Sequence, residues 1–237
     1  MSIANKPKGL VENRLLATLP DEVLARLLPH LQPVSFALGG VVYESSERMD
    51  SLYFPTTCIV SLLYTMTDGA TAEMGLVGND GVVGVALFMG GNTVPNRAVA
   101  QVAGDSFGVP APVLLEEFRR GGPCQLLLLR YTQALITQIS QTAVCNRLHS
   151  VEQRLCRWLL LTHDRVRSAE LLLTQEFIAN MLGGRRESVT KAAGRLQKSG
   201  LIRYVRGHIT ILDRHGLEAT SCECYQVVKT EFDRLLG

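Results

Sequence analysis

The stretch from Gln125 to His163 contains neither Gly nor Pro. A single helix over it would be roughly 55 Å long at 1.5 Å per residue, which is too long for one small domain to cover. Small and apolar residues recur there at heptad spacing, chiefly Leu129, Ile136, Ile139 and Ala143. The stretch predicts either an amphipathic core helix or a helix that pairs with its copy in a homodimer. A second apolar stripe around Trp158 would serve the chain's own domains and favours the homodimer.

The segments on either side of this helix differ in character. From Val34 to about Val113, short β-rich pieces alternate with Gly, Asp, Asn and Pro turns, which is typical of an all-β roll. A short helix is expected before it, at "PDEVLARLLPHL". We therefore predict an α+β chain with a roll over residues 1–123, a long helix over 124–164 and a C-terminal domain over 165–237.

Charge is distributed unevenly between these parts. Residues 1–164 hold 12 Lys and Arg against 14 Asp and Glu, whereas residues 165–237 hold 12 against 8. Seven basic residues and one acid, Glu187, lie between Arg185 and Arg206. This concentration predicts a surface that binds a polyanion, although a charge run of this kind is more often only a solvated helix face.

The overall composition suits a globular chain in a reducing compartment. Apolar residues make up 46 % of the sequence, and we find no signal-peptide or membrane-spanning apolar run, so we expect a cytoplasmic protein that does not contact a membrane. Six cysteines without a repeated spacing are most simply free thiols, and we expect no metal and no cofactor. Cys222-Glu223-Cys224 is the one close thiol pair; packing thiols are the commoner interpretation, with redox or metal sensing as the alternative.

The basic segment has the pattern of a helix-turn-helix. A short helix after Thr174 is followed by Gly183-Gly184, where glycine permits a tight turn. A second helix is expected from about Arg186, with small and apolar residues on its inner face and basic residues opposite. The pieces "LIRYV", "RG" and "HITIL" then predict a β-hairpin that would form a wing.

This arrangement assigns roles in DNA recognition. Arg185 and Arg186, at the start of the second helix, would contact a guanine edge or a phosphate, and Glu187 would accept from a cytosine amine. The full predicted DNA-binding set is Thr174, Gln175, Arg185, Arg186, Glu187, Ser188, Lys191, Arg195, Lys198 and Arg206. Thr174, Gln175, Arg195 and Lys198 are expected to contact mainly phosphates.

With these motifs in place, the sequence resembles the bacterial Crp/Fnr regulators over nearly its whole length. The most specific stretches are "LTQEFIANMLGGRRESVTKAAGRLQKSGLI" and "SVEQRLCRWLLL". The family's Arg-Glu-Ser/Thr-Val signature, followed closely by Arg or Lys, is matched by Arg186, Glu187, Ser188, Val189 and Lys191. The resemblance implies a roll that senses an effector, a dimerising helix, and a winged helix that binds a two-fold symmetric operator. It also implies RNA polymerase as a further partner.

The same resemblance leaves the effector open. Cyclic-nucleotide-binding members carry a Gly-Glu motif and a downstream Arg; here Arg97 stands in the Arg position, but Gly84 is followed by Val85. Glu73 or Asp80 would be the substitutes, and Arg97 alone fits a structural or relic role equally well. An iron–sulfur sensor needs an N-terminal cysteine cluster, and the first cysteine is Cys58. Haem sensing remains open.

Two other function classes compete with a DNA-binding regulator. A cupin enzyme needs several histidines inside the roll, and residues 1–123 contain only His30, so we do not expect an enzyme. The alternative is a small-molecule or redox-sensing module whose effector controls dimer geometry without a dedicated operator. The sequence favours a homodimeric transcriptional regulator with a degenerate cyclic-nucleotide pocket.

Overall fold

The computed structural model describes residues 9–166, 170–172 and 175–237. The chain divides into two compact units. The first contains the described residues up to Leu62, together with Leu76–Ala134 and Leu235–Gly237; the second contains Leu63–Gly75 and the described part of Leu135–Arg234. Among the described residues, no helix combines the length and the apolar character needed to cross a membrane.

The first unit begins with short helical segments that pack through leucines. They are η2 (Leu10–Glu12), α1 (Arg14–Thr18), α2 (Asp21–Leu27) and η3 (Leu28–His30). Asn13 caps α1 by accepting from the Leu16 backbone N–H, and its side-chain amide donates to the carbonyls of Pro55 and Gly81. Asn13 is fully buried, and both its side-chain oxygen and its side-chain amide have hydrogen-bond partners. It therefore holds the helices against the strands.

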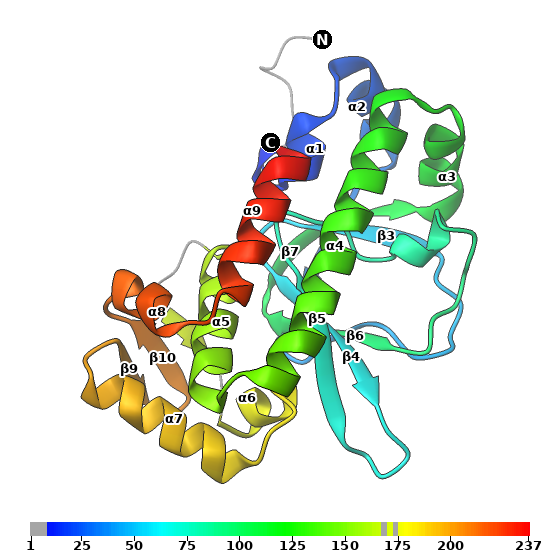
Figure 1. Ribbon diagram of the computed structural model, residues 1–237. Helices are drawn as coiled ribbons and strands as arrows, with labels where there is room; N and C mark the ends of the chain where they lie inside the picture. Colours follow the sequence, from blue (N-terminus) through cyan, green and yellow to red (C-terminus); the bar gives the residue numbers. More distant parts are fainter. Residues whose placement is uncertain (1–8, 167–169, 173–174) are drawn as a thin grey trace. The chain divides into compact units, whose positions relative to one another are not determined.

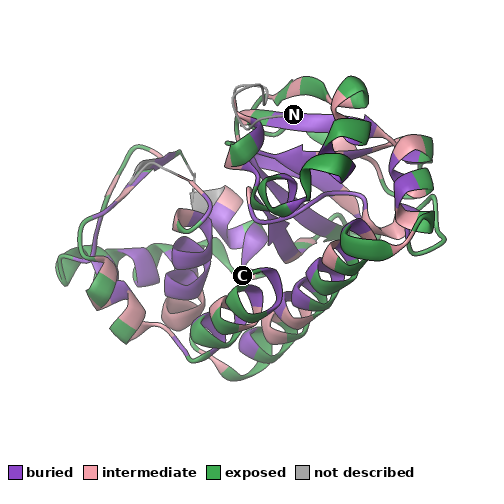
Figure 2. Cartoon of the chain, turned by 90° about the horizontal axis from the view of Figure 1, so that it is seen from above, coloured by how far each residue is buried: buried purple, intermediate pink, exposed green. Residues whose placement is uncertain are grey.

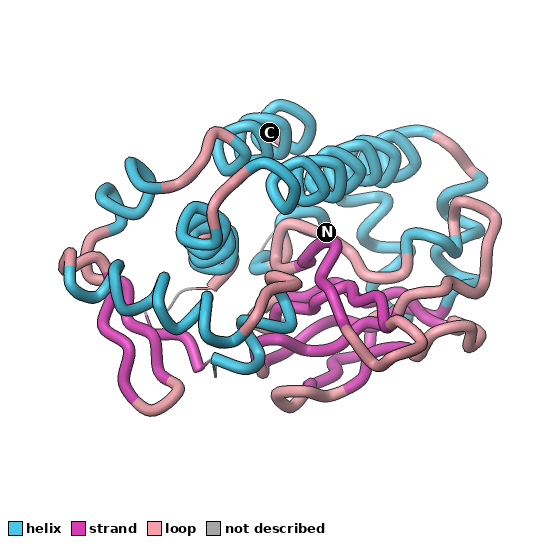
Figure 3. Tube along the Cα trace, turned by 60° about the horizontal axis from the view of Figure 1, so that its bottom comes forward, coloured by secondary structure: helices cyan, strands magenta, loops and turns pink. Residues whose placement is uncertain are grey.

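The strands between residues 32 and 110 form two sheets, as the alternating texture of the sequence predicts (Figure 3). One has the order β1-β7-β3, with both pairings antiparallel, and the other the order β2-β6-β4-β5. The bounds are β1 Gln32–Phe36, β2 Val41–Tyr43, β3 Ser51–Pro55, β4 Ile59–Thr65, β5 Thr71–Val77, β6 Arg97–Val102 and β7 Gly104–Pro110. β3 to β7 are largely buried (Figure 2), with Leu52, Ile59, Ala98 and Val109 fully covered, whereas β1 and β2 are half-buried or exposed.

Two further segments close this unit. The 3₁₀ turn η4 (Val85–Leu87) lies between β5 and β6, and α3 (Ala111–Arg119) follows β7. The rings of Phe88 and Phe118 stack with centroids 5.2 Å apart. Arg26 of α2 makes two hydrogen bonds to the buried Glu117 carboxylate, at 2.7 and 2.6 Å, and this lowers the pKa of Glu117.

The predicted single helix over residues 124–164 is wrong in one respect, because the structure has two helices there. α4 runs from Gly122 to Leu148 and α5 from Val151 to His163 (Figure 1). Ser150 begins α5 with a capping box: its hydroxyl accepts from the Gln153 backbone N–H, and the Gln153 side chain accepts from the Ser150 backbone N–H. A Ser-x-x-Gln capping box starts a new helix without Gly or Pro, so counting those two residues alone missed the break.

The second unit contains the C-terminal elements, packed on α5. Leu155, Leu159, Ile178, Val189 and Leu217 are fully buried in its core. The elements are β8 Glu170–Leu172, α6 Gln175–Met181, α7 Arg186–Lys198, β9 Ile202–Val205, β10 His208–Ile211, α8 Arg214–Thr220 and α9 Cys224–Leu236. The three strands form an antiparallel sheet in the order β8-β10-β9.

Candidate nucleic-acid interface

The turn between α6 and α7 has the geometry that its glycines predict. The backbone N–H of Gly184 donates to the carbonyl of Ala179 at 3.0 Å, which closes the end of α6. Gly183 has a φ of +57°, the left-handed region that glycine enters at little cost, whereas Gly184 does not. Arg185 is the N-cap of α7, so the predicted start of the second helix at Arg186 is confirmed.

α7 is amphipathic in the predicted sense. Val189, Ala192, Ala193 and Leu196 are buried on its inner face. The opposite face is exposed and carries Glu187, Thr190, Lys191, Gly194, Arg195 and Lys198. The small inner residues let α7 approach α5 and α6, and the basic residues are left on the solvent side.

The hairpin of β9 and β10 is the predicted wing. Its two-residue turn is Arg206-Gly207, with φ values of +50° and +85°, as a tight hairpin turn with two positive φ values requires. The Tyr204 backbone N–H donates to the Gln197 side chain at 2.7 Å, and the Leu201 N–H donates to the Leu196 carbonyl. These bonds fix the wing to the end of α7, so helix and wing present one surface.

The basic residues of this surface differ in their partners. Arg195 pairs through Nε with the carboxylate of Glu152 on α5. Among the residues whose side chains the structure describes, no ion pair is found for Arg185, Arg186, Lys191, Lys198 or Arg206. Five positive charges on one face therefore have no counter-ion from the described chain, which is the arrangement expected of a polyanion-binding surface.

Some predicted contact residues cannot be placed on this surface. Thr174 lies outside the described residues, and of Gln175 the structure describes only the backbone as the first residue of α6. Ser188, the second residue after Arg186, is half-buried. The predicted set is otherwise brought together on α7 and the wing.

α5 supports the helix-turn-helix from behind. The Arg154 guanidinium donates to the carbonyl of Leu182 in the turn. Burial lowers the pKa of Arg154, and the nearby Arg157 acts in the same direction. The indole N–H of Trp158 donates to the buried carboxylate of Glu73 at 2.9 Å, which ties α5 to the β4–β5 hairpin. The sequence stretch "SVEQRLCRWLLL" thus supplies the contacts that position the turn.

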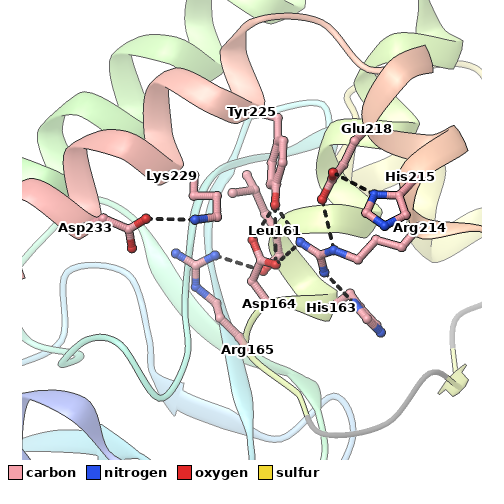
Figure 4. A network of polar contacts seen from close by, with 10 residues as sticks. All are labelled: Leu161, His163, Asp164, Arg165, Arg214, His215, Glu218, Tyr225, Lys229 and Asp233. Atoms are coloured by element: carbon pink, nitrogen blue, oxygen red, sulfur yellow. Dashed lines mark hydrogen bonds and ion pairs between the residues drawn. The ribbon is translucent and has the colours of Figure 1, made fainter. Parts of the chain in front are cut away.

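A second polar network, drawn in Figure 4, joins the end of α5 to α8 and α9. Arg214 contacts Asp164 at 2.6 Å, Glu218 at 3.0 Å and the Tyr225 hydroxyl at 2.7 Å. It also donates to His163 Nδ1 at 2.7 Å. Burial first, and then the Arg214 charge, lower the pKa of His163, which keeps the ring neutral and able to accept.

The predicted effector residues occupy several environments. Arg97 pairs with Glu44 at 2.9 Å and is one-third exposed, while its Nε is buried with no hydrogen-bond partner among the described residues. Gly84 has a φ of +104° and precedes η4, which begins with Val85. Asp80 is buried in the first unit, whereas Glu73 belongs to the second unit and contacts Trp158.

The predicted dimer residues lie along α4. Leu129 is 48 % exposed and Ile136 is 55 % exposed in the single chain, and Ala143, one heptad further, is also exposed. Ile139 is half-buried. One heptad column therefore faces solvent, and large apolar side chains in such a column are the usual mark of an unfilled helix–helix contact.

Two groups of residues in the second unit were not anticipated from the sequence. Glu152 pairs with Arg195, and only its place in the first turn of α5 could have indicated a surface role. Cys145 and His149 lie beside Cys222 and Cys224. The i, i+4 spacing of Cys145 and His149 was available in the sequence as a signal, but nothing in the sequence placed it near the C-terminal pair.

The comparisons with known proteins agree with this geometry. Residues 153–220 match the family model of the Crp-like helix-turn-helix domain. No curated protein matches the chain. Among solved structures, FixK2 from Bradyrhizobium japonicum has a TM-score of 0.68 at 16 % identity, covering 81 % of this chain and 98 % of that one.

Two further solved structures share the fold. A putative Crp/Fnr-family transcriptional regulator from Eubacterium rectale has a TM-score of 0.68 at 19 % identity, covering 87 % of this chain and 96 % of its own. TTHB099, a CRP-family transcriptional regulator from Thermus thermophilus, has a TM-score of 0.65 at 21 % identity, covering 79 % and 96 %. The predicted α+β fold, with N-terminal sheets, a long helix and a C-terminal helix-turn-helix, is confirmed.

Proposed function

Because residues 153–220 are a Crp-like helix-turn-helix domain in a chain with the fold of Crp/Fnr regulators, we propose that this protein is a sequence-specific DNA-binding transcriptional regulator. The observation that carries the proposal is the outer face of α7, where Arg185, Arg186, Lys191 and Lys198 have no acidic partner among the described residues. A buried inner face and an unneutralised basic outer face are what a helix inserted in the major groove requires.

The two ends of α7 divide the work of recognition in this proposal. Arg186 and Glu187 lie in the first turn, where a recognition helix meets base edges, and Arg186 can make two hydrogen bonds to guanine. Lys198 in the last turn and Arg206 at the wing tip contact phosphates. Arg195 joins them only when it leaves Glu152.

The protein acts as a homodimer through α4. The exposed column of Leu129, Ile136 and Ala143 supports this, because a second copy of the same column would cover it. Two recognition helices related by a two-fold axis read a palindromic site with half-sites about one helical turn apart. Bound near a promoter, such a dimer regulates by contacting RNA polymerase.

The experiment that tests the proposal selects genomic DNA fragments on the purified chain and sequences the bound pool. An inverted repeat whose half-site centres are about 10 base pairs apart is the expected result. Light scattering on the same preparation should give the mass of two chains. Selection of no common motif, with the fold intact by circular dichroism, would contradict sequence-specific binding, and a monomer at micromolar concentration would contradict the dimer.

The variant Ile136→Glu tests the link between dimer and operator. A carboxylate in the middle of the apolar column leaves an unpaired charge at the contact, so we expect a monomer with strongly reduced affinity for the full palindrome. The matched control is Gln141→Glu, which places the same carboxylate at a half-buried polar position about 140° around α4 from Ile136, away from the column. Equal behaviour of the two variants would place the dimer contact elsewhere.

Cyclic AMP is not the effector of the roll in this proposal. A ribose hydroxyl needs a carboxylate acceptor, and the first residue of η4 is the apolar Val85. The Arg97 charge is already neutralised by Glu44, although its Nε retains an unused donor. A nucleotide whose phosphate contacts Arg97 would therefore bind weakly, and its affinity would not depend on the hydroxyl groups of the sugar.

A further inference from the structure

Three cysteines and one histidine of the second unit converge at one point. Their ligand atoms, the sulfurs of Cys145, Cys222 and Cys224 and a ring nitrogen of His149, all lie within 4.8 Å of one another. All three cysteines are buried. None of these four residues belongs to the predicted DNA-binding set, so the cluster has no role in that interface.

Two local structures bring the four residues together. Cys145 and His149 are one helical turn apart at the end of α4, and the His149 backbone N–H donates to the Cys145 carbonyl, so both side chains leave the same face. Cys222 and Cys224 bracket the start of α9, just after α8 ends. A Cys-x₃-His pair thus meets a Cys-x-Cys pair.

Two of the distances between ligand atoms fit a tetrahedral metal ion. Bonds of about 2.3 Å to sulfur and 2.0–2.1 Å to nitrogen give a tetrahedron with edges of about 3.5–3.8 Å. The Cys145 and Cys222 sulfurs are 3.5 Å apart, and the Cys224 sulfur is 3.6 Å from His149 Nδ1. The two sulfurs are too far apart for a disulfide, whose bond is about 2.05 Å.

The histidine is held as a metal-bound histidine is held. Nδ1 faces the Cys224 sulfur, and Nε2 lies 3.4 Å from the carboxylate of Glu223, the residue between the two cysteines. A carboxylate on the outer ring nitrogen fixes the tautomer that leaves the inner nitrogen free to bind a cation. His149 is only 14 % exposed, so its ring has little freedom to turn away.

The surroundings of the cluster include a positive charge. Arg157 is buried, its Nη2 donates to Thr142 at 2.6 Å, and no carboxylate among the described residues pairs with it. Thr142 lies three residues before Cys145 on α4, and a cation near a thiol stabilises the thiolate that a metal ion binds.

We propose that Cys145, His149, Cys222 and Cys224 form a structural site for one Zn²⁺ ion per chain, with Glu223 as a positioning residue on His149. Three thiolates and a neutral imidazole are a common ligand set for structural zinc, which binds four protein ligands and leaves no open position. The ion ties the last turn of α4 to the junction of α8 and α9. The ion cross-links these segments of the second unit and has no catalytic role.

Cobalt substitution on the full chain tests this. The chain is stripped with chelator under reducing conditions and titrated with Co²⁺, whose tetrahedral thiolate complexes have intense visible bands and a near-ultraviolet charge-transfer band. We expect saturation at one Co²⁺ per chain and displacement by one equivalent of Zn²⁺. Metal analysis of the freshly purified chain should find zinc and not iron.

Matched variants make the result specific. Cys222→Ala and His149→Ala should lose the tetrahedral spectrum, whereas Cys124→Ala, which removes a buried thiol from the first unit, should keep it. Glu223→Gln should keep one ion but bind it about 10-fold more weakly, as removal of an outer partner does. Glu223 is exposed, so this variant tests the site without disturbing the core.

Three outcomes would overturn the proposal. The first is a weak octahedral cobalt spectrum, or binding that the Cys222→Ala and Cys124→Ala variants share, which would mean an adventitious ion only. The second is iron in the fresh protein. The third is a Cys145–Cys222 disulfide found by peptide mass spectrometry in place of the metal, which would assign the cluster to redox chemistry.

Discussion

Arg97 in the roll and Arg186 at the start of α7 are both arginines that the sequence predicts to contact an anion, and they differ in their partners. Arg97 is one-third exposed and pairs with Glu44 at 2.9 Å. Arg186 is exposed on the first turn of α7 and has no ion pair to another described residue. Glu44, which neutralises the Arg97 charge, lies 53 positions away in the sequence. The residues next to each arginine in the sequence therefore could not show which of the two has an acidic partner.

The difference shows what an anion site must avoid. An arginine already held by a carboxylate gives up that pair before it binds a ligand, so much of the gain from the new contact is lost. Among the side chains that the structure describes, Arg186 has no such pair to break. Within α7 the same contrast recurs on a smaller scale, because Arg195 is held by Glu152 and Lys198 is not.

The largest expected effect is on Arg186. Arg186→Ala should cost about 1–3 kcal/mol of operator binding and relax the preference at one base pair per half-site, because a bidentate base contact is lost. Arg97→Ala should change operator binding by less than about 0.5 kcal/mol. Fluorescence anisotropy against a panel of operator variants measures both.

Equal losses for the two arginine variants would break the comparison. The panel of operator variants distinguishes a lost base contact from unfolding, because a variant that merely unfolds the domain weakens binding to every sequence alike. Circular dichroism of both variants serves as the control for folding.

Lys198 should show a smaller and different loss. Because Lys198 is predicted to contact a phosphate, Lys198→Ala should weaken binding to all operator variants alike and reduce the slope of log K against log salt by about one. A salt titration of both α7 variants distinguishes the roles. A base-specific loss for Lys198→Ala would show that the assignment of base and phosphate contacts is reversed.

A substitution at Glu152 is expected to increase the affinity for DNA. Glu152→Gln removes the carboxylate that holds Arg195, so this arginine can reach DNA without breaking an ion pair. Because exposed ion pairs contribute only about 0.2–1 kcal/mol, we expect binding to tighten by a few-fold at low salt. In the Arg195→Ala background the same substitution should have little effect, and this double-mutant cycle is the control. A loss of affinity would count against a DNA contact for Arg195.

The smallest expected effect is that of cyclic AMP, which should leave operator affinity unchanged. Val85 offers no acceptor to the ribose hydroxyl, and Glu44 already neutralises Arg97. Calorimetric titration of the dimer measures direct binding. Micromolar or tighter binding that Arg97→Ala abolishes, accompanied by tighter operator binding, would restore the nucleotide-sensor interpretation.

Local sequence was sufficient wherever the structure depends on neighbouring residues. The start of α7 at Arg186, its buried face and the wing turn at Arg206-Gly207 follow from glycine conformation and from helical and strand periodicity, which act over a few residues. The break between α4 and α5 is also local, since Ser150 and Gln153 are three residues apart. Gly and Pro do not mark this break, because a Ser-x-x-Gln capping box can begin a helix without either residue.

The tertiary structure decided which side chains have partners. Arg97 with Glu44, Arg195 with Glu152 and Trp158 with Glu73 are contacts between residues 43 to 85 positions apart. The cysteine cluster is the clearest case, because Cys145 and Cys222 are separated by 77 residues and touch only after α4, α8 and α9 have packed. Charge neutralisation and metal coordination act through space over a few ångströms, and distance along the chain does not report them.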